Sequence, residues 1–237
     1  MKGLFIAGTD TGCGKTRVAC TLAEALRRQG LAIAPFKPVA AGAIATPAGL
    51  RNEDALALIE ACGGHWAYDA VNPVCLRAPI SPHLAAREAG VAIDVDELAG
   101  RARRLAEVAD LVLAEGAGGW MAPISDRLTM EDLALALDLP VLLVVGLRLG
   151  CLNHALLTAA RMQACGVRAV GWIGSVIDPA MQGLEENIAT LQERLSLPML
   201  GVLPHGDPGR AVMAWSVRLD ELLSRLAPEP RWSGWNP

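Results

Sequence analysis

The stretch Gly8-Thr9-Asp10-Thr11-Gly12-Cys13-Gly14-Lys15-Thr16 decides the fold of this chain. A short apolar run, residues 2–7, leads into it, and residues 16–29 follow it with the apolar spacing of a helix. In a strand–turn–helix arrangement of this kind, backbone N–H groups and the helix N-terminus face a phosphate. Residues 31–39 predict a second strand, so the chain opens with a βαβ unit of a parallel sheet.

Two side chains of this turn suit a bound triphosphate. Lys15 can reach the β- and γ-phosphates, and the hydroxyl of Thr16 can bind Mg²⁺. The pattern G-x-x-x-x-G-K-[ST] is not met strictly, because five residues separate Gly8 from Gly14. The alternative is a plain glycine turn, but the strand before it and the helix after it favour a phosphate-binding loop.

The same alternation of strand and helix continues along the chain. It predicts a doubly wound, mostly parallel α/β sheet with helices on both faces, similar to P-loop NTPases. We expect one domain over residues 1–226 and a C-terminal tail over residues 227–237 that holds Trp232 and Trp235. The later strands are predicted at residues 111–114, 139–145, 169–176 and 199–203, and the later helices at 53–61, 95–109, 153–165, 184–195 and 212–226.

Composition excludes several classes of protein. Of the 237 residues, 52% are hydrophobic and only 4% are aromatic, which favours a large core and argues against surfaces that stack nucleic-acid bases. The net charge is −4 and no basic block occurs, so we expect no nucleic-acid partner. The arginines of residues 95–109 are interpreted as a solvated face.

Nothing in the sequence predicts a membrane protein. The longest apolar stretch, residues 133–147, is interrupted by Asp138 and Pro140, and the apolar run at residues 3–7 is too short for a signal peptide. The six cysteines show no C-x-x-C pair, so they are expected to be buried or free thiols rather than disulfides or zinc ligands. We therefore expect a cytoplasmic protein.

Three charged residues lie where a ligand of such a sheet would bind. Lys37 follows the second strand and Glu115 follows the strand at 111–114, and parallel strands present their carboxyl ends at one edge. Lys37 can screen an anionic intermediate, although a lone lysine is more often merely exposed. Glu115 suits a second Mg²⁺ contact, and Asp54 is either a third or an ordinary acid at a helix N-terminus.

A second helix start follows the strand at residues 139–145. Gly150-Cys151-Leu152-Asn153 comes next, with Asn153 as the expected N-cap. The N-terminus of this helix can bind a carboxylate, or the helix can simply be capped. The four histidines are scattered, so their spacing predicts no metal site.

Taken in order, these motifs resemble the dethiobiotin synthetase family. The similarity rests on residues 8–16, Lys37-Pro38-Val39, residues 115–119 and 150–155, with Thr46-Pro47, residues 52–56, Val71-Asn72-Pro73 and Ser81-Pro82-His83 between them. It covers roughly residues 1–204. The resemblance implies an ATP-dependent ligase of biotin synthesis. It carboxylates 7,8-diaminononanoate to a carbamate, phosphorylates the carbamate and closes a cyclic urea.

The resemblance also implies roles for individual residues, with ATP as co-substrate and Mg²⁺ as cofactor. Lys37 and Lys15 would be catalytic, and Thr16, Asp54 and Glu115 would hold the metal. The substrate would contact Thr11, Lys37, Ala41 and Gly118, and its carboxylate would be held by Gly150, Cys151, Leu152 and Asn153 of the partner subunit in a homodimer. The nucleotide would contact Gly12, Cys13, Gly14, Lys15, Thr16, Arg17, Asp54, Glu115, Gly116, Ala117, Gly118, Ser175, Pro204, His205 and Gly206.

Some positions depart from the family pattern. Gly12 and Cys13 stand where many members have an acid and an aliphatic residue, and Ala41 stands where a serine is usual. Ser175 stands where an asparagine often reads the adenine, so other nucleoside triphosphates could be used. His205 and Gly206 follow the usual base-side loop only loosely.

Two other functions fit parts of the sequence. A related P-loop amidoligase would share the phosphate loop, and turnover that requires bicarbonate would separate it from the diamine ligase. A nucleotide switch that partners with DNA or membrane would need a further lysine near the start of the loop, where this chain has Thr9, Asp10 and Thr11. Stimulation of ATP hydrolysis by DNA or lipid would support that function.

Overall fold

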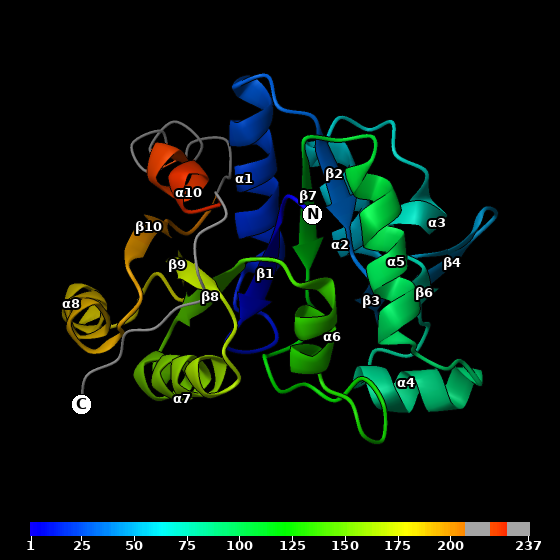
Figure 1. The fold of residues 1–237 in the computed structure, drawn as a ribbon. Coiled ribbons are helices and arrows are strands. Elements are labelled where there is room, and N and C mark those ends of the chain that lie inside the picture. Colours follow the sequence, from blue (N-terminus) through cyan, green and yellow to red (C-terminus); the bar gives the residue numbers. More distant parts are fainter. Residues whose placement is uncertain (207–218, 227–237) are drawn as a thin grey trace.

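The computed structural model describes residues 1–206 and 219–226, which build a layered α/β fold around one parallel sheet (Figure 1). The sheet has six strands in the order β10-β9-β8-β1-β7-β2, with every neighbouring pair parallel. The doubly wound class and five of the six predicted strands are confirmed, and the sixth, predicted at 31–39, is shorter than expected. The strands are β1 Gly3–Gly8, β2 Ile33–Phe36, β7 Leu111–Glu115, β8 Val141–Leu147, β9 Ala169–Val176 and β10 Met199–Leu203.

Alternation along β1 explains why helices cover both faces. Leu4 and Ile6 belong to one apolar cluster and Phe5 and Ala7 to the other, because successive side chains of a strand point to opposite faces. The first cluster is covered by α1 Lys15–Arg28, α2 Glu53–Ala61 and α10 Leu219–Leu226. The second includes residues of α4 Pro82–Ala89, α5 Val95–Ala106, α6 Met130–Leu137, α7 Cys151–Ala164 and α8 Leu184–Arg194.

The predicted strand at 31–39 proves to be two separate strands. β2 ends at Phe36, and β3, Val39–Ala40, pairs instead with β6, Val74–Cys75. The backbone N–H of Lys37 donates to the carbonyl of Val71 at 2.8 Å, and Pro38 has no N–H to donate to the main sheet. The chain therefore leaves the sheet directly after Phe36, with Lys37 at its edge.

Several short elements were not predicted. A hairpin joins β4, Ile44–Thr46, to β5, Gly49–Arg51, and α3, Tyr68–Val71, follows α2. The helices α4 and α6 were not predicted as whole elements either. Short elements carry too few residues for their periodicity to stand out.

Two helices have boundaries that differ from the predicted ones. The helix predicted at 153–165 begins at Cys151, and its N-cap is Gly150 rather than Asn153. Gly150 has φ 97°, a left-handed conformation that favours glycine, so the chain turns into the helix before Asn153 is reached. The helix predicted at 95–109 ends at Ala106. For the helix predicted at 212–226, residues 219–226 are helical and 212–218 lie outside the described residues, as does the tail 227–237.

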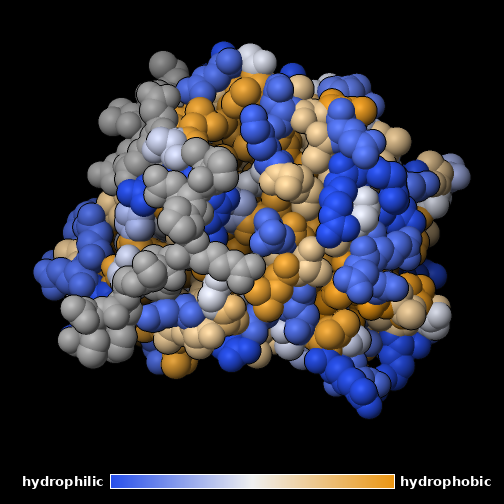
Figure 2. Space-filling model, in the orientation of Figure 1, coloured by the Kyte–Doolittle hydropathy of each residue, from blue (hydrophilic) through white to orange (hydrophobic). Residues whose placement is uncertain are grey.

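The surface over α5 is hydrophilic in Figure 2. Arg101 forms an ion pair with Glu97 at 2.8 Å on this helix, and Arg103 and Arg104 are exposed. These contacts agree with the interpretation of the arginines as a solvated face. Among the described helices, none has both the length and the apolar character needed to cross a membrane.

Candidate functional site

The phosphate loop lies between β1 and α1, as the sequence predicts. Gly12 and Gly14 have φ values of 70° and 91°, which L side chains rarely adopt. A Cβ at Gly14 would also lie 2.3 Å from the Oγ of Ser175, so only glycine fits there. The loop can therefore fold tightly onto β9 and bring its backbone to the start of α1.

Lys15 crosses from α1 to the loop after β7. Its side chain is nearly buried, and its Nζ donates to the carbonyl of Asp10 at 2.9 Å and to that of Gly118 at 2.6 Å. These partners are neutral, so they hold the ammonium in place without neutralising it. The charge of Lys15 remains available for an anion.

Sheet register brings Lys37 and Glu115 together. Phe36 pairs with Ala114, so the residues that follow them lie side by side at the strand ends. The Nζ of Lys37 lies 2.6 Å from Oε1 of Glu115, 3.1 Å from Oδ2 of Asp54 and 3.3 Å from the carbonyl of Gly116. Thr16 donates its hydroxyl to the same Glu115 oxygen at 2.7 Å. We call Thr16, Lys37, Asp54 and Glu115 the acid–lysine cluster.

Burial and charge act against each other in this cluster. Lys37 is 2% exposed and Glu115 is 0% exposed. Burial alone disfavours the charged lysine, but the carboxylates of Glu115 and Asp54 outweigh it and raise the pKa of Lys37. Burial likewise disfavours ionised Asp54, but Lys37 and Thr16 outweigh it and lower the pKa of that carboxyl. Lys37 and Asp54 are therefore both charged at neutral pH.

A set of hydrogen bonds behind the cluster positions Lys37 and Asp54. The Asn72 side chain donates to the carbonyl of Lys37 at 2.6 Å, and the Tyr68 hydroxyl donates to Asn72 at 2.9 Å. Asn52 caps α2 by accepting from the N–H of Asp54 at 3.1 Å, and its own N–H donates to Tyr68 at 2.6 Å. Asp54 is thus an acid of the first helical turn, as one of its two predicted roles has it, and it is also an ion-pair partner of Lys37, which was not predicted.

The donor set of the cluster fits Mg²⁺. Thr16, Asp54 and Glu115 offer only oxygen ligands, which this cation prefers. Oε2 of Glu115 is buried without a hydrogen-bond partner among the described residues. No group of three His, Cys, Asp or Glu side chains suits a metal in the described part of the chain. Mg²⁺ is usually held by one or two protein carboxylates together with phosphate oxygens, and Asp54 and Glu115 offer two carboxylates.

These residues line a cleft of about 740 Å³ beyond the carboxyl ends of β1, β2 and β7. It gathers twelve predicted site residues: Thr11, Gly12, Gly14, Lys15, Thr16, Arg17, Lys37, Ala41, Asp54, Glu115, Ala117 and Gly118. It also has eight lining residues to which the sequence assigned no role: Ala40, Asn52, Pro79, Ile80, Ser81, Pro82, Ala122 and Ile177. Ser81 and Pro82 lay in a stretch that carried the family resemblance; Pro79 and Ile80 gave no signal.

The predicted base-binding residues lie beside the cleft rather than along its lining. Ser175 is 0% exposed, and its Oγ has no hydrogen-bond partner among the described residues. Cys13 is also buried. Pro204, His205 and Gly206 are exposed after β10, and Arg17 donates to the carbonyls of Pro204 and Gly206.

The predicted carboxylate-binding segment is separate from the cleft. Gly150, Cys151, Leu152 and Asn153 form the start of α7, and none of them lines the cleft. The neighbouring Leu149 is 92% exposed. Within one chain, the structure does not bring this segment to the acid–lysine cluster.

The six cysteines, all within the described residues, are free. Burial raises the pKa of Cys20 and of Cys62 to about 12, which makes these thiols poor nucleophiles.

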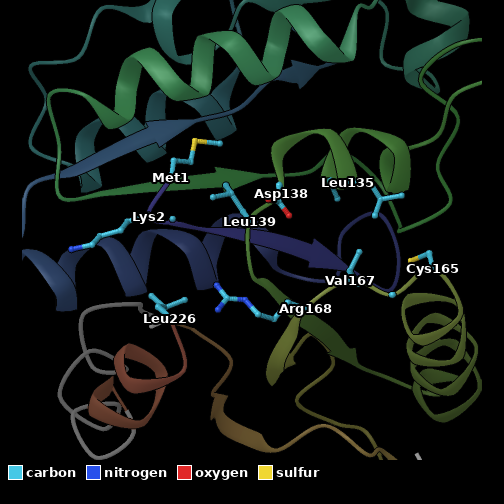
Figure 3. A pocket seen from close by; sticks show the side chains of 12 residues that line it. Met1, Lys2, Leu135, Asp138, Leu139, Cys165, Val167, Arg168 and Leu226 are labelled. Carbon is cyan, nitrogen blue, oxygen red and sulfur yellow. The ribbon is translucent and has the colours of Figure 1, made fainter. Parts of the chain in front are cut away.

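A second cavity, of about 450 Å³, lies at the opposite edge of the sheet (Figure 3). Lys2, Leu139 and Arg168 line it where β1, β8 and β9 begin. Open α/β sheets bind ligands at the carboxyl ends of their strands, and no predicted site residue reaches this cavity.

Solved structures share the fold. The MinC:MinD cell division protein complex from Aquifex aeolicus gives a TM-score of 0.59 over 98% of this chain and 100% of that chain, at 14% identity. The cell division ATPase MinD from Pyrococcus furiosus gives 0.55 over 95% and 98%, at 16% identity. Identities this low concern the architecture alone.

Comparisons of the sequence find relatives of much higher identity. A family model described as an AAA domain matches residues 2–208. A protein named ATP-dependent dethiobiotin synthetase BioD from Pseudomonas paraeruginosa is 50% identical over 90% of this chain and 95% of its own. Its namesake from Xylella fastidiosa is 46% identical over 88% and 92%. The chain belongs to the family of ATP-dependent dethiobiotin synthetases.

Proposed function

We propose that this protein converts 7,8-diaminononanoate, CO₂ and ATP into dethiobiotin, ADP and phosphate, the ring-closing ligation of biotin synthesis. The observation that carries the proposal is the acid–lysine cluster, which adjoins Lys15 in one cleft. Two lysines there face the place where two anions, a carbamate and a triphosphate, must meet.

The chemistry proceeds through one addition and two bond exchanges. One amine adds to CO₂ and loses a proton, which gives the carbamate. A carbamate oxygen then attacks the γ-phosphorus of ATP and ADP leaves. Finally the second amine attacks the carbamate carbon and loses its proton, a second C–N bond forms and phosphate leaves. Lys15 and Lys37 lower the repulsion between the anions and stabilise charge on the transferred phosphoryl group. Thr16, Asp54 and Glu115 would hold Mg²⁺, which when bound neutralises phosphate charge.

The cleft also suits the aliphatic part of the diamine. Ala40, Ala41, Pro79, Ile80 and Ala122 also line it, together with the charged groups. An apolar wall beside a charged end can bury methylene groups while the amines stay near Lys37. Ala41 has no hydroxyl to offer the diamine. Binding of the diamine therefore depends on the fit of its aliphatic part to the cleft, on Thr11 and on the backbone near Gly118.

We extend the proposal to a homodimer in which α7 of the partner subunit completes the cleft. Of the fourteen residues of α7, only Cys151, Ala155 and Met162 are buried. Leu149 is 92% exposed and Leu157 is 64% exposed, and the proposed contact with a second copy would bury them. The start of the partner's α7 would then hold the substrate carboxylate. Analytical ultracentrifugation of Leu157→Asp tests this interface, and we expect the variant to dimerise less than the wild type. A variant that dimerises as strongly as the wild type would contradict the proposed interface.

Phosphate release from MgATP tests the function directly. We expect release only when both 7,8-diaminononanoate and bicarbonate are present, together with a cyclic urea detected by mass spectrometry. Release that is indifferent to the diamine would leave a P-loop NTPase with another substrate. The use of ATP points to the cytoplasm as the compartment that we propose.

A further inference from the structure

The residues that line the cleft fix the orientation of a bound nucleotide. Lys15 and Thr16 mark the phosphates, and the acid–lysine cluster lies on the side of β2 and β7. Since the reacting γ-phosphate must face Lys37, the base must extend the other way, over Arg17 and Ile177 toward the ends of β9 and β10. Both of these residues line the cleft.

Arg17 joins the phosphate loop helix to the segment after β10. Its Nη2 donates to the carbonyl of Pro204 at 2.6 Å and to that of Gly206 at 3.0 Å. Arg17 directly follows Thr16, so the same turn of α1 contacts both ends of the nucleotide site. Two hydrogen bonds from a charged donor fix a short main-chain segment more firmly than neutral ones do.

The side chain of Ser175 cannot contact the nucleotide base. Ser175 is fully buried, and a Cβ on Gly14 would lie 2.3 Å from its Oγ, which places it directly beneath the phosphate loop. A serine side chain is too short to pass the loop and reach a base. Recognition of the base is therefore left to the main chain of residues 204–206.

We propose that Arg17 is a positioning residue for the nucleotide base: it holds residues 204–206 at the base end of the cleft, so that base binding depends on Arg17 and not on the serine side chain at position 175. The proposal rests on the nucleotide site of the proposed function. The ligand it concerns is the base of a nucleoside di- or triphosphate, whose edge pairs with peptide N–H and C=O groups.

Binding of two probes separates the base end from the phosphate end. For Arg17→Met, which keeps the stem but removes the donors, we expect the affinity for MgADP to fall on the order of tenfold, the value of roughly one charge-assisted hydrogen bond. Inorganic tripolyphosphate, which has no base, should bind Arg17→Met as it binds the wild type. A KM for ATP that rises by a larger factor than kcat falls is the matching kinetic result.

Arg27→Met is the matched control. Arg27 lies on the same helix and also donates to a main-chain carbonyl, that of Ala61 at 3.0 Å, but it does not line the cleft. The control should bind MgADP within twofold of the wild type. Unchanged MgADP affinity in Arg17→Met would overturn the proposal, and so would an equal loss for tripolyphosphate, since that loss would arise from charge alone.

Binding is measured without the diamine, so it does not depend on the ligase reaction. A protein that binds MgADP through Arg17 but makes no cyclic urea would refute the proposed function and leave this inference standing. A protein that makes the urea while Arg17→Met keeps full MgADP affinity would do the reverse.

Discussion

The two ends of the cleft are held together differently. Where β2 and β7 end, the four side chains of the acid–lysine cluster are joined by hydrogen bonds and ion pairs. Beside β9 and β10, the side chain of Arg17 is hydrogen-bonded to the main chain of Pro204 and Gly206. Lys37 contacts Glu115 and Asp54 directly, whereas the buried hydroxyl of Ser175 has no partner among the described residues. Coupled charges therefore fix the end beside β2 and β7. The end beside β9 and β10 is held by the two hydrogen bonds of Arg17.

Removing one side chain should affect the two ends of the cleft differently. The largest expected effect is on the free energy of unfolding. Lys37→Met leaves Glu115 buried without its cation, which should cost about 3–5 kcal/mol of unfolding free energy. Ser175→Ala removes an unpartnered hydroxyl and should change it by about 0.5 kcal/mol or less. Denaturant unfolding measures both. The double variant Lys37→Met/Glu115→Gln should recover much of the loss; no recovery would contradict the coupling.

Loss of either lysine should reduce turnover strongly. Lys15→Ala and Lys37→Ala are each expected to lower the rate on the order of 10²-fold or more, because each removes a positive charge from the place where the two anions meet. Product formation at saturating substrates measures this, with Arg27→Ala as a control on the same helix as Lys15. Wild-type rates in Lys37→Ala would end its catalytic role.

The metal requirement should follow from Glu115. Glu115→Gln keeps the size of the side chain but removes its charge, so the Mg²⁺ concentration for half-maximal activity should rise about tenfold or more. A Mg²⁺ titration of activity measures the shift, and Ser81→Ala, a change at a lining residue outside the acid–lysine cluster, is the control. An unaltered titration curve would remove Glu115 from the metal site.

At the base end, a longer side chain should sharpen nucleotide choice. Ser175→Asn offers a carboxamide that can reach past Gly14, and one new hydrogen bond should increase the preference for ATP over CTP or GTP about fivefold. Ratios of kcat/KM for the three nucleotides measure this. The same ratios in Ser175→Asn and the wild type would show that position 175 stays out of base recognition even with the longer side chain.

The smallest effect concerns pH. The pKa of Asp54 lies below its ordinary value of 3.8 and that of Lys37 above 10.5, so their pairing is present between these values. It is lost as the pH falls through the first folded pKa or rises through the second. The difference in unfolding free energy between the wild type and Asp54→Asn should therefore stay constant from about pH 5 to 9. A steady decline within that window would show that Lys37 is not held protonated.

Much of the chemical end was predictable because it follows from strand ends. Gly8 and Glu115 are the last residues of apolar strands and Lys37 directly follows one, and parallel strands end at one edge. The positions of Ile80 and Pro79 were not predictable, since no periodicity or motif marks a loop that folds over a cleft. The Asn153 N-cap was wrong for a similar local reason, because glycine at 150 allowed an earlier turn.

By itself, the sequence determined the six parallel strands, the phosphate loop and the family, since apolar period, glycine spacing and motif order are all local properties of the chain. Only the tertiary structure decided which groups meet. The register of β2 against β7 sets Lys37 on Glu115, close packing beneath Gly14 buries Ser175, and Arg17 reaches Pro204 across the site. Contacts between residues this far apart in the chain depend on how elements pack, which no local pattern encodes.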